Sequence, residues 1–546
     1  MAERNTEKLF YSVQRMRYMA PAIPRRLFEI FLLLFLSKLF VLLFVNDFWI
    51  EPDPLLYAER ARALWERHSL WLAEGLPKTY PLYSVLLAPA FALGDRMLVL
   101  KGMLAISSLL SSAIVFPAYL IARRLGVEKA IFAALTVGLL PSSFNYAFAL
   151  MAESVYLPLF LLSAWLVAVA LERDDLRSHL LAGVSLALAY LAKPLALAAV
   201  LGALATLAWN CYRKKRLLDG RWLIPAIPLL TVIAWDALLM VATGEASAYS
   251  KTSQFLSALS LAVSDVSRML ELAVFLGNEF VFLLLASGIV LLPCALLLPF
   301  TRAGRRNAPL LLFTLFSGAA MLFFSALHAF AAPLAGEPYR SVFGRYEEAA
   351  VPLLVLLGLA GLYALAEARR NAGRLMFYLP FAASVIAIAL FTPTVGVDMI
   401  HNMSAFIFYA LASASSPLLL ALAAAVLFAT LLSIPMVRSR FPELLLAFLI
   451  ISSMLISIIE IGASHQPAYK FAAWLHDNDP GTSRVVLDRN DYDYRYPSGE
   501  LLAMRYWTND EIVVGDVDEN ADYVISSRFL PYQQVFRWDG HALYRK

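Results

Sequence analysis

Apolar runs long enough to cross a lipid bilayer recur along this sequence from Leu27 to Ile461. Of its 546 residues, 60% are hydrophobic and 16% are charged, and the mean hydropathy is +0.68, so the chain is far more apolar than a soluble domain, of which about half is apolar. Inside lipid a backbone must satisfy its own hydrogen bonds, and a run of about 20 apolar residues does so as a helix. The sequence therefore predicts an α-helical polytopic membrane protein.

The pattern predicts roughly thirteen transmembrane helices at about 20 residues each. The predicted spans are 27–46, 97–122, 130–150, 154–171, 179–193, 195–211, 222–242, 272–299, 309–331, 347–366, 375–393, 405–434 and 442–462. The expected organisation is a basic N-terminus at 1–26, a transmembrane domain at 27–462 and a soluble domain at 463–546.

The positions of lysine and arginine in the loops predict the orientation, because cytoplasmic loops are enriched in both. Alternate loops are consistently basic, for example at Arg123/Arg124, Arg213–Arg216 and Arg369/Arg370. We expect these loops and the N-terminus to be cytoplasmic. After an odd number of spans in the plasma membrane, the C-terminus is expected to be extracytoplasmic.

Two outer stretches are too long to be simple connectors, and long ordered loops commonly carry function. In the first, 47–96, Tyr57, Ala61, Leu64 and Trp65 share one helical face and the charged residues share the other, which is typical of a helix in the membrane interface. A second apolar segment at 81–93 is too short to span and is expected to be re-entrant or interfacial.

The second outer stretch is the tail, 463–546, in which charges become dense. Short β-branched and aromatic runs separated by turn residues predict strands. They lie at 485–487, 512–514, 523–525, 535–536 and 542–544. We expect a small extracytoplasmic α/β domain.

An acidic group follows the first span and consists of Asp47, Glu51 and Asp53. Carboxylates there suit a general base or a divalent metal site. Pro52 and Pro54 restrict the backbone on both sides of Asp53, which favours a functional role for this residue, whereas solvation at a helix end explains the other two equally well. His328 is a weaker metal candidate, for which packing is the favoured role.

Ionisable side chains in apolar stretches also concentrate near the outer face, where Glu153 and Glu279 lie. Ionisable groups in membrane segments are candidates for function because they are costly there. The outer cations can converge on one cavity and suit a phosphate ligand, although Lys193 can also extend to the lipid headgroups. These cations are Lys78, Lys193, Arg340 and Arg345. Acid, cations and an apolar groove together fit a lipid-phosphate substrate.

Five ordered motifs carry a family resemblance: Asp53 to Leu64, Tyr80 to Tyr83, Ala152 to Ser154, Leu191 to Pro194, and Gly344 to Tyr346. In this order they resemble the GT-C class of membrane glycosyltransferases. The similarity is to the family 39-related branch that contains protein O-mannosyltransferases and the aminoarabinose transferase of lipid A. It implies a GT-C-like fold and sugar transfer from a polyprenyl-phosphate or dolichyl-phosphate donor to a glycan, lipid or protein.

The resemblance also implies residue roles. Asp53 would be the base that activates the acceptor, Glu153 would line the cavity near it, and Lys193 and Arg345 would hold the donor phosphate as it leaves, with inversion at the anomeric carbon. Pro54 stands where many members have Glu, so metal dependence is left open. Further substrate-binding candidates are Tyr57, Lys78, Tyr83, Arg340 and Tyr346. The expected partners are the bilayer, the lipid donor and the acceptor, with no nucleic acid.

The main alternative is a transporter or flippase of a lipid-linked or anionic solute, since intramembrane charges also mark transport paths. The charges collect at the outer face rather than the midplane, and no inverted repeat is visible, which argues against transport. A third hypothesis is an assembly subunit that presents the tail domain and catalyses nothing.

Overall fold

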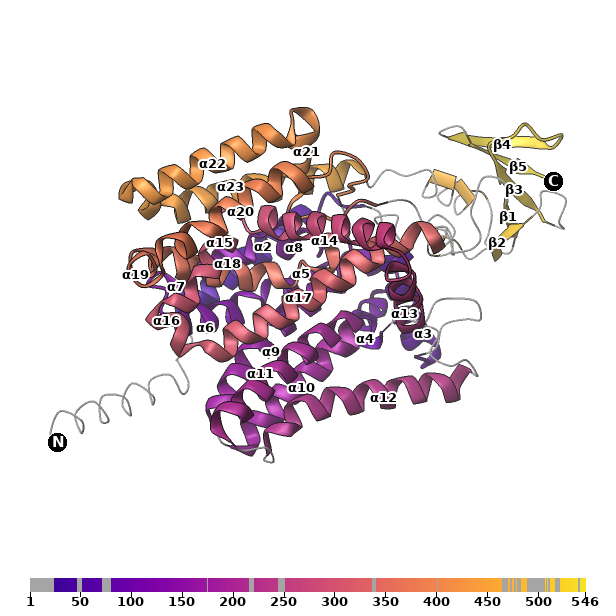
Figure 1. Cartoon of the computed structure of the whole chain (residues 1–546). Helices are drawn as coiled ribbons and strands as arrows, with labels where there is room; N and C mark the ends of the chain where they lie inside the picture. Colours follow the sequence, from indigo (N-terminus) through magenta and orange to yellow (C-terminus); the bar gives the residue numbers. More distant parts are fainter. Residues whose placement is uncertain are drawn as a thin grey trace. The chain divides into compact units, whose positions relative to one another are not determined.

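The computed structural model (Figure 1) is described here for residues 24–46, 52–70, 80–173, 175–215, 220–243, 251–335, 340–399 and 401–463. In the tail it is described for 470–471, 474–475, 478, 483–488, 506, 508, 511–515, 521–538 and 541–546. Contacts divide the chain into two compact units. The first consists of 1–35, 111–144 and 155–453, and the second of 36–110, 145–154 and 454–546.

Helices dominate the described chain. The first half contains α2 (Arg25–Leu42), α3 (Pro52–Arg67), α4 (Pro81–Leu87), η1 (Ala88–Leu93), α5 (Arg96–Ser112), α6 (Val115–Leu125), α7 (Ala130–Gly138), α8 (Pro141–Asn145), α9 (Glu153–Glu172), α10 (Leu176–Ala192), η2 (Pro194–Ala196), α11 (Leu197–Lys214), η3 (Gly220–Trp222), α12 (Leu223–Thr243) and α13 (Lys251–Ala262). The second half contains α14 (Val266–Ala286), α15 (Leu291–Leu297), η4 (Leu298–Phe300), α16 (Arg302–Arg306), α17 (Ala308–Ala331), η5 (Ala332–Ala335), η6 (Gly344–Tyr346), α18 (Ala350–Tyr363), α19 (Leu365–Asn371), α20 (Arg374–Phe391), α21 (Phe406–Ala414), α22 (Pro417–Ser433) and α23 (Pro435–Ala463).

The polytopic helical fold is confirmed, with fewer uninterrupted spans than the sequence predicts. Among the described residues, 8 helices are long and apolar enough to cross a membrane, and 10 if each of two bent pairs forms one span. The bent pairs are α18 with α19, which meet at 72°, and α21 with α22, which meet at 120°. These pairs correspond to the single spans predicted at 347–366 and 405–434.

Backbone breaks account for other differences in the spans. The span predicted at 272–299 is divided into α14 and α15, because Gly288 and Ile289 adopt φ values of 71° and 68°. A left-handed conformation ends a right-handed helix, and it is unusual for a β-branched residue such as isoleucine. The span predicted at 130–150 is divided too, since α7 ends at Gly138 and Pro141 starts the short α8. Hydropathy alone does not reveal such breaks.

Close helix packing in the first unit depends on small residues. α11 packs against α17, α10 against α12, and α15 against α18. A Cβ atom at Gly361 of α18 would lie 2.1 Å from the carbonyl oxygen of Cys294 in α15, and one at Gly358 would lie 2.4 Å from that of Leu291. Glycines one turn apart therefore allow the two backbones to approach, as is common between membrane helices.

In the second unit, α3 packs against α4 and η1. The predicted helix is present, but the charged face is not uniformly exposed. Arg60, predicted on the charged face, is fully buried, whereas Trp65, predicted on the apolar face, is 45% exposed. Packing on several sides of a short helix overrides the two-faced pattern that its sequence predicts.

All five predicted strands of the tail are confirmed. They are β1 (Arg484–Asp488), β2 (Glu511–Gly515), β3 (Tyr523–Ser526), β4 (Gln533–Trp538) and β5 (His541–Arg545), in the sheet order β2-β1-β3-β5-β4. β1 is parallel to β2 and β3, and β5 is antiparallel to β3 and β4. At the end of β1, the buried carboxylate of Asp488 accepts hydrogen bonds from Ser526 and Arg528.

Candidate functional site

The second unit brings together three of the predicted site residues. The rings of Tyr57 in α3 and Tyr83 in α4 meet edge to face, with centroids 5.1 Å apart. The Tyr83 hydroxyl shares a hydrogen bond of 2.5 Å with Ser107, and Tyr83 is close enough to Glu153 to interact electrostatically. Glu153 is buried in the first turn of α9, where the positive end of the helix dipole favours a carboxylate. The tyrosine pair thus links two motifs that are far apart in the sequence.

Asp53 lies in the first turn of α3 and is half-buried. Tyr57 follows four residues later, so both side chains project from the same face of the helix. Pro52 is the first helical residue, a position that tolerates proline because its missing N–H would have no helical partner there. The predicted base is therefore held by a regular helix start beside the tyrosine pair.

Lys193 is positioned by the proline that follows it. The residue before a proline disfavours helical dihedral angles, and Lys193 adopts φ −155° and ψ 130°, which ends α10. Pro194 then opens η2, which leads into α11. The lysine is 6% exposed and its ammonium lies 5.7 Å from the centre of the Tyr346 ring. Two motifs of the resemblance thus meet in the first unit.

Tyr346 belongs to a group of packed rings. It stacks on His328 with centroids 5.3 Å apart, and His328 meets Phe343 edge to face at 4.5 Å. The favoured packing role of His328 agrees with these contacts. Arg345, directly before Tyr346, is 7% exposed, so its charge is placed in a largely buried part of the unit. This cation-and-ring group comprises Lys193, His328, Phe343, Arg345 and Tyr346.

Arg340, another of the predicted cations, has an acidic partner. Its guanidinium lies 3.2 Å from the carboxylate of Asp398, which is also 2.6 Å from Nδ1 of His401. Burial alone would raise the pKa of Asp398, but the hydrogen bonds and charge of His401, together with the charge of Arg340, lower it below its usual value. Arg340 therefore brings less net charge to a phosphate than an unpaired cation would.

Several polar residues near this group were not among the sequence candidates. Asn278, Asp398, His401 and Asn402 contact the 340–346 segment or its side chains. The signal that could have found Asn278 is its place in an apolar run next to Glu279. No local signal indicated that Asp398, His401 and Asn402 contact the 340–346 segment, because that segment is more than 50 residues away in the sequence.

Three sequence candidates, Asp47, Glu51 and Lys78, lie outside the described residues. The metal candidates Asp53 and His328 are described, but no group of three or more His, Cys, Asp or Glu side chains that could hold a metal ion occurs in the described part.

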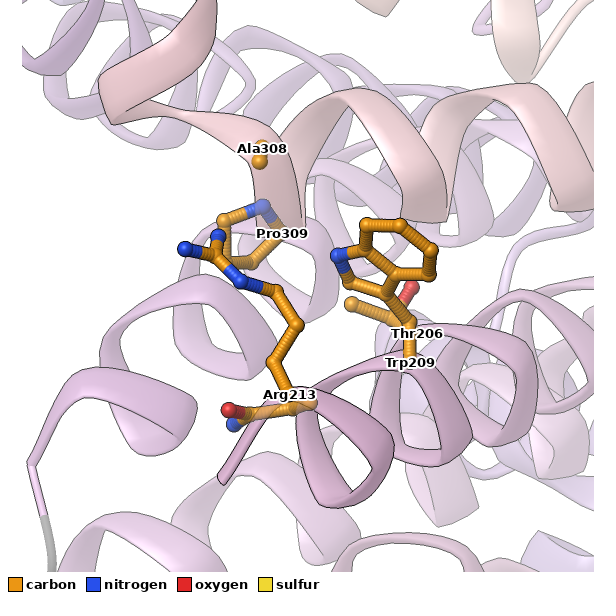
Figure 2. A pocket seen from close by; sticks show the side chains of 6 residues that line it. Thr206, Trp209, Arg213, Ala308 and Pro309 are labelled. Carbon is orange, nitrogen blue, oxygen red and sulfur yellow. The ribbon is translucent and has the colours of Figure 1, made fainter. Parts of the chain in front are cut away.

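A cavity of about 260 Å³ lies elsewhere in the first unit, between the end of α11 and the start of α17. Figure 2 shows Trp209 and Arg213 rising from α11 toward Pro309. None of its lining residues is a predicted site residue; they are Thr206, Trp209, Asn210, Arg213, Ala308 and Pro309. This cavity is therefore distinct from the cation-and-ring group.

The described fold is similar to that of a solved membrane protein of the GT-C class. Over 94% of this chain and 97% of the other, it is similar to the crystal structure of ArnT from Cupriavidus metallidurans bound to undecaprenyl phosphate, with a TM-score of 0.52 and 14% identity. The apo form of that ArnT gives a TM-score of 0.51 at 14% identity, with the same coverage of both chains. The arabinosyltransferase EmbB from Mycobacterium smegmatis has a TM-score of 0.40 and 17% identity, over 85% of this chain and 43% of that one.

Residues 76–243 match the family described as dolichyl-phosphate-mannose-protein mannosyltransferase. No curated protein sequence matches the chain significantly. The predicted resemblance to the GT-C class is thereby confirmed, since the fold extends over almost the whole chain and the family match contains the Tyr80, Glu153 and Lys193 motifs. These findings support a membrane glycosyltransferase and not the transporter alternative.

Proposed function

We propose that this chain transfers a sugar from a polyprenyl-phosphate donor to an acceptor on the extracytoplasmic face of the plasma membrane. The observation that carries the proposal is the contact of Lys193 with Tyr346, because it joins two motifs that the family resemblance assigns to donor binding. The undecaprenyl phosphate bound to the ArnT of similar fold supports a lipid phosphate as the leaving group.

The proposed reaction is a single displacement with inversion. Asp53 removes the proton from the acceptor hydroxyl as that oxygen attacks the anomeric carbon. The bond from that carbon to the donor phosphate oxygen breaks, and Lys193 and Arg345 stabilise the negative charge that develops on the phosphate. Charges held in a site with little water stabilise such a transition state more strongly than they would in bulk water.

The proposal is tested with membrane vesicles whose extracytoplasmic face is outward. They are given a radiolabelled polyprenyl-phosphate sugar, and the transfer of the labelled sugar is measured. Replacing Asp53 by Asn removes the base at nearly constant size, and loss of a general base lowers rates by about 10²–10⁴-fold. The matched control is Glu66→Gln at the other end of α3, where the carboxylate is 49% exposed and pairs with Arg62. We expect the control to transfer sugar at the wild-type rate.

Transfer that survives Asp53→Asn would remove the assignment of the base. If no donor supports transfer and a solute undergoes counterflow, transport replaces glycosyl transfer. The proposed orientation is tested separately by a reporter fused after Lys546, which we expect to be extracytoplasmic.

A further inference from the structure

The backbone before Arg345 is held by side chains from other parts of the first unit. Asn278 Nδ2 donates to the carbonyl oxygen of Ser341 at 2.8 Å, and Ser325 Oγ donates to that of Phe343 at 2.6 Å. The N–H of Phe343 donates to Oε1 of Glu279 at 2.6 Å. These three bonds connect α14 and α17 to a segment of the chain that is not helical.

Asn402 completes this set from the stretch between α20 and α21. Its Oδ1 accepts the N–H of Gly344 at 3.2 Å, and its Nδ2 donates to the carbonyl oxygens of Val342 at 3.5 Å and Asp398 at 3.1 Å. One amide side chain thus fixes the residue directly before Arg345 and also its own loop. We call Asn278, Glu279, Ser325 and Asn402 the backbone clamp.

The clamp residues are almost completely removed from solvent. Asn278 is 7% exposed, and Glu279, Ser325 and Asn402 are each 0% exposed. Burying polar side chains costs free energy unless they are hydrogen-bonded, and irregular backbone in an apolar setting must find partners outside itself. A continuous helix would satisfy the same backbone groups without any of these side chains.

Comparison with a helical 340–346 segment indicates the role of the clamp. If residues 340–346 formed a continuous helix, Arg345 and Tyr346 would project at helical intervals. In the structure they instead project from the short turn η6, which lies beside Lys193. We infer that Asn402 and Glu279 are positioning residues, which hold the Gly344–Tyr346 backbone so that Arg345 and Tyr346 meet the donor phosphate. This inference rests on the proposed function, because it assigns a task to residues that contact neither substrate.

Donor and acceptor kinetics of Asn402→Leu test the inference. Leucine matches asparagine in size but makes none of the three hydrogen bonds. Displacement of a catalytic group by about 1 Å can reduce rates by about 100-fold. We expect kcat/KM for the lipid donor to fall at least about tenfold with KM for the acceptor unchanged.

A second pair of variants tests Glu279. Glu279→Gln should keep donor kinetics within about twofold, because its amide oxygen can accept the same N–H, whereas Glu279→Leu should not.

The matched control is Asn210→Leu, which removes an asparagine hydrogen bond of the same unit, from Nδ2 to the carbonyl oxygen of Leu171 at 3.3 Å. We expect it to leave donor kinetics unchanged. Should Asn402→Leu fail to fold, Ser325→Ala removes one clamp bond with a smaller change and is expected to affect donor kinetics in the same direction.

A double-mutant cycle with Arg345→Gln separates positioning from general stability. If Asn402 acts through Arg345, Asn402→Leu should have little further effect on donor kcat/KM in the Arg345→Gln background. Fully additive losses, or equal effects on donor and acceptor, would overturn the inference and leave the proposed function standing. An Arg345→Gln variant with normal donor kinetics would instead contradict the proposed role of Arg345 itself.

Discussion

The ammonium of Lys193 lies 5.7 Å from the centre of the Tyr346 ring. A cation at this distance from the face of a tyrosine ring is stabilised by its π electrons, and the ring also orients the lysine side chain. Lys193 is placed by the end of α10, and Tyr346 is placed by the backbone clamp. This contact therefore joins two segments, the end of α10 and the clamped segment before Arg345, that different parts of the fold hold in place.

We predict that Lys193→Gln lowers kcat/KM for the lipid donor by about 10²-fold, the usual cost of losing one group that stabilises transition-state charge. Tyr346→Leu should have a smaller effect of the same sign, because it removes the orienting ring and keeps the cation. Steady-state transfer at varied donor concentration measures both.

The control for this prediction is Lys129→Gln, an exposed lysine paired with Glu443. Equal losses in the control and in Lys193→Gln would mean that the effect is not specific to the cation-and-ring group.

We predict that Gly344→Ala impairs both stability and transfer. A Cβ atom at residue 344 would lie 2.3 Å from the ring of Phe282, so either the ring or the clamped backbone must move. Overpacking of this kind costs about 1–3 kcal/mol. A thermal melt in detergent and the donor assay measure the two effects.

A matched control for Gly344→Ala is Gly318→Ala in α17, where a Cβ atom meets nothing within 4 Å. Wild-type behaviour of Gly344→Ala in both assays would show that the close approach to Phe282 is not required.

The lowered pKa of Asp398 predicts a pH-dependent contribution to stability. A carboxylate whose pKa is lower in the folded state stabilises that state above its unfolded pKa of about 3.9, and the contribution is lost as the pH falls through the folded value. Wild type should exceed Asp398→Asn in stability at pH 5, by less than about 1 kcal/mol because the pair is partly exposed. The difference should shrink toward pH 3.

Thermal melts of both proteins between pH 5 and pH 3 measure this difference, below the range where an ordinary histidine titrates. A constant difference across that range would mean that the charge of Asp398 does not contribute.

Metal dependence provides another test of the first outer loop. Pro54 stands where many members of the family that the sequence resembles have Glu, so we predict that transfer persists in EDTA. The measurement is donor transfer in vesicles washed with EDTA, then supplied with Mg²⁺ or Mn²⁺. Loss of transfer in EDTA and recovery with the ion would instead show that the loop works with a divalent metal.

Local signals in the sequence were sufficient for the tail strands and for the helical nature of the apolar runs. The tail strands follow from short β-branched and aromatic runs, and the apolar runs predict the helices. The end of α10 at Lys193 follows from Pro194, because a proline acts on the residue directly before it. The motifs around Tyr83, Glu153, Lys193 and Tyr346 were located from the family resemblance, which also needs no coordinates.

Tertiary structure alone decided the rest. The ion pair of Arg340 with Asp398, the burial of Arg60 and the bond of Asn402 to Gly344 all depend on which segments pack together. Hydropathy also predicted an unbroken helix across Gly288 and Ile289, since it measures apolar length and carries no information on φ. Periodicity and proline act over a few residues, whereas a buried polar group is satisfied by whatever partner the fold brings near it.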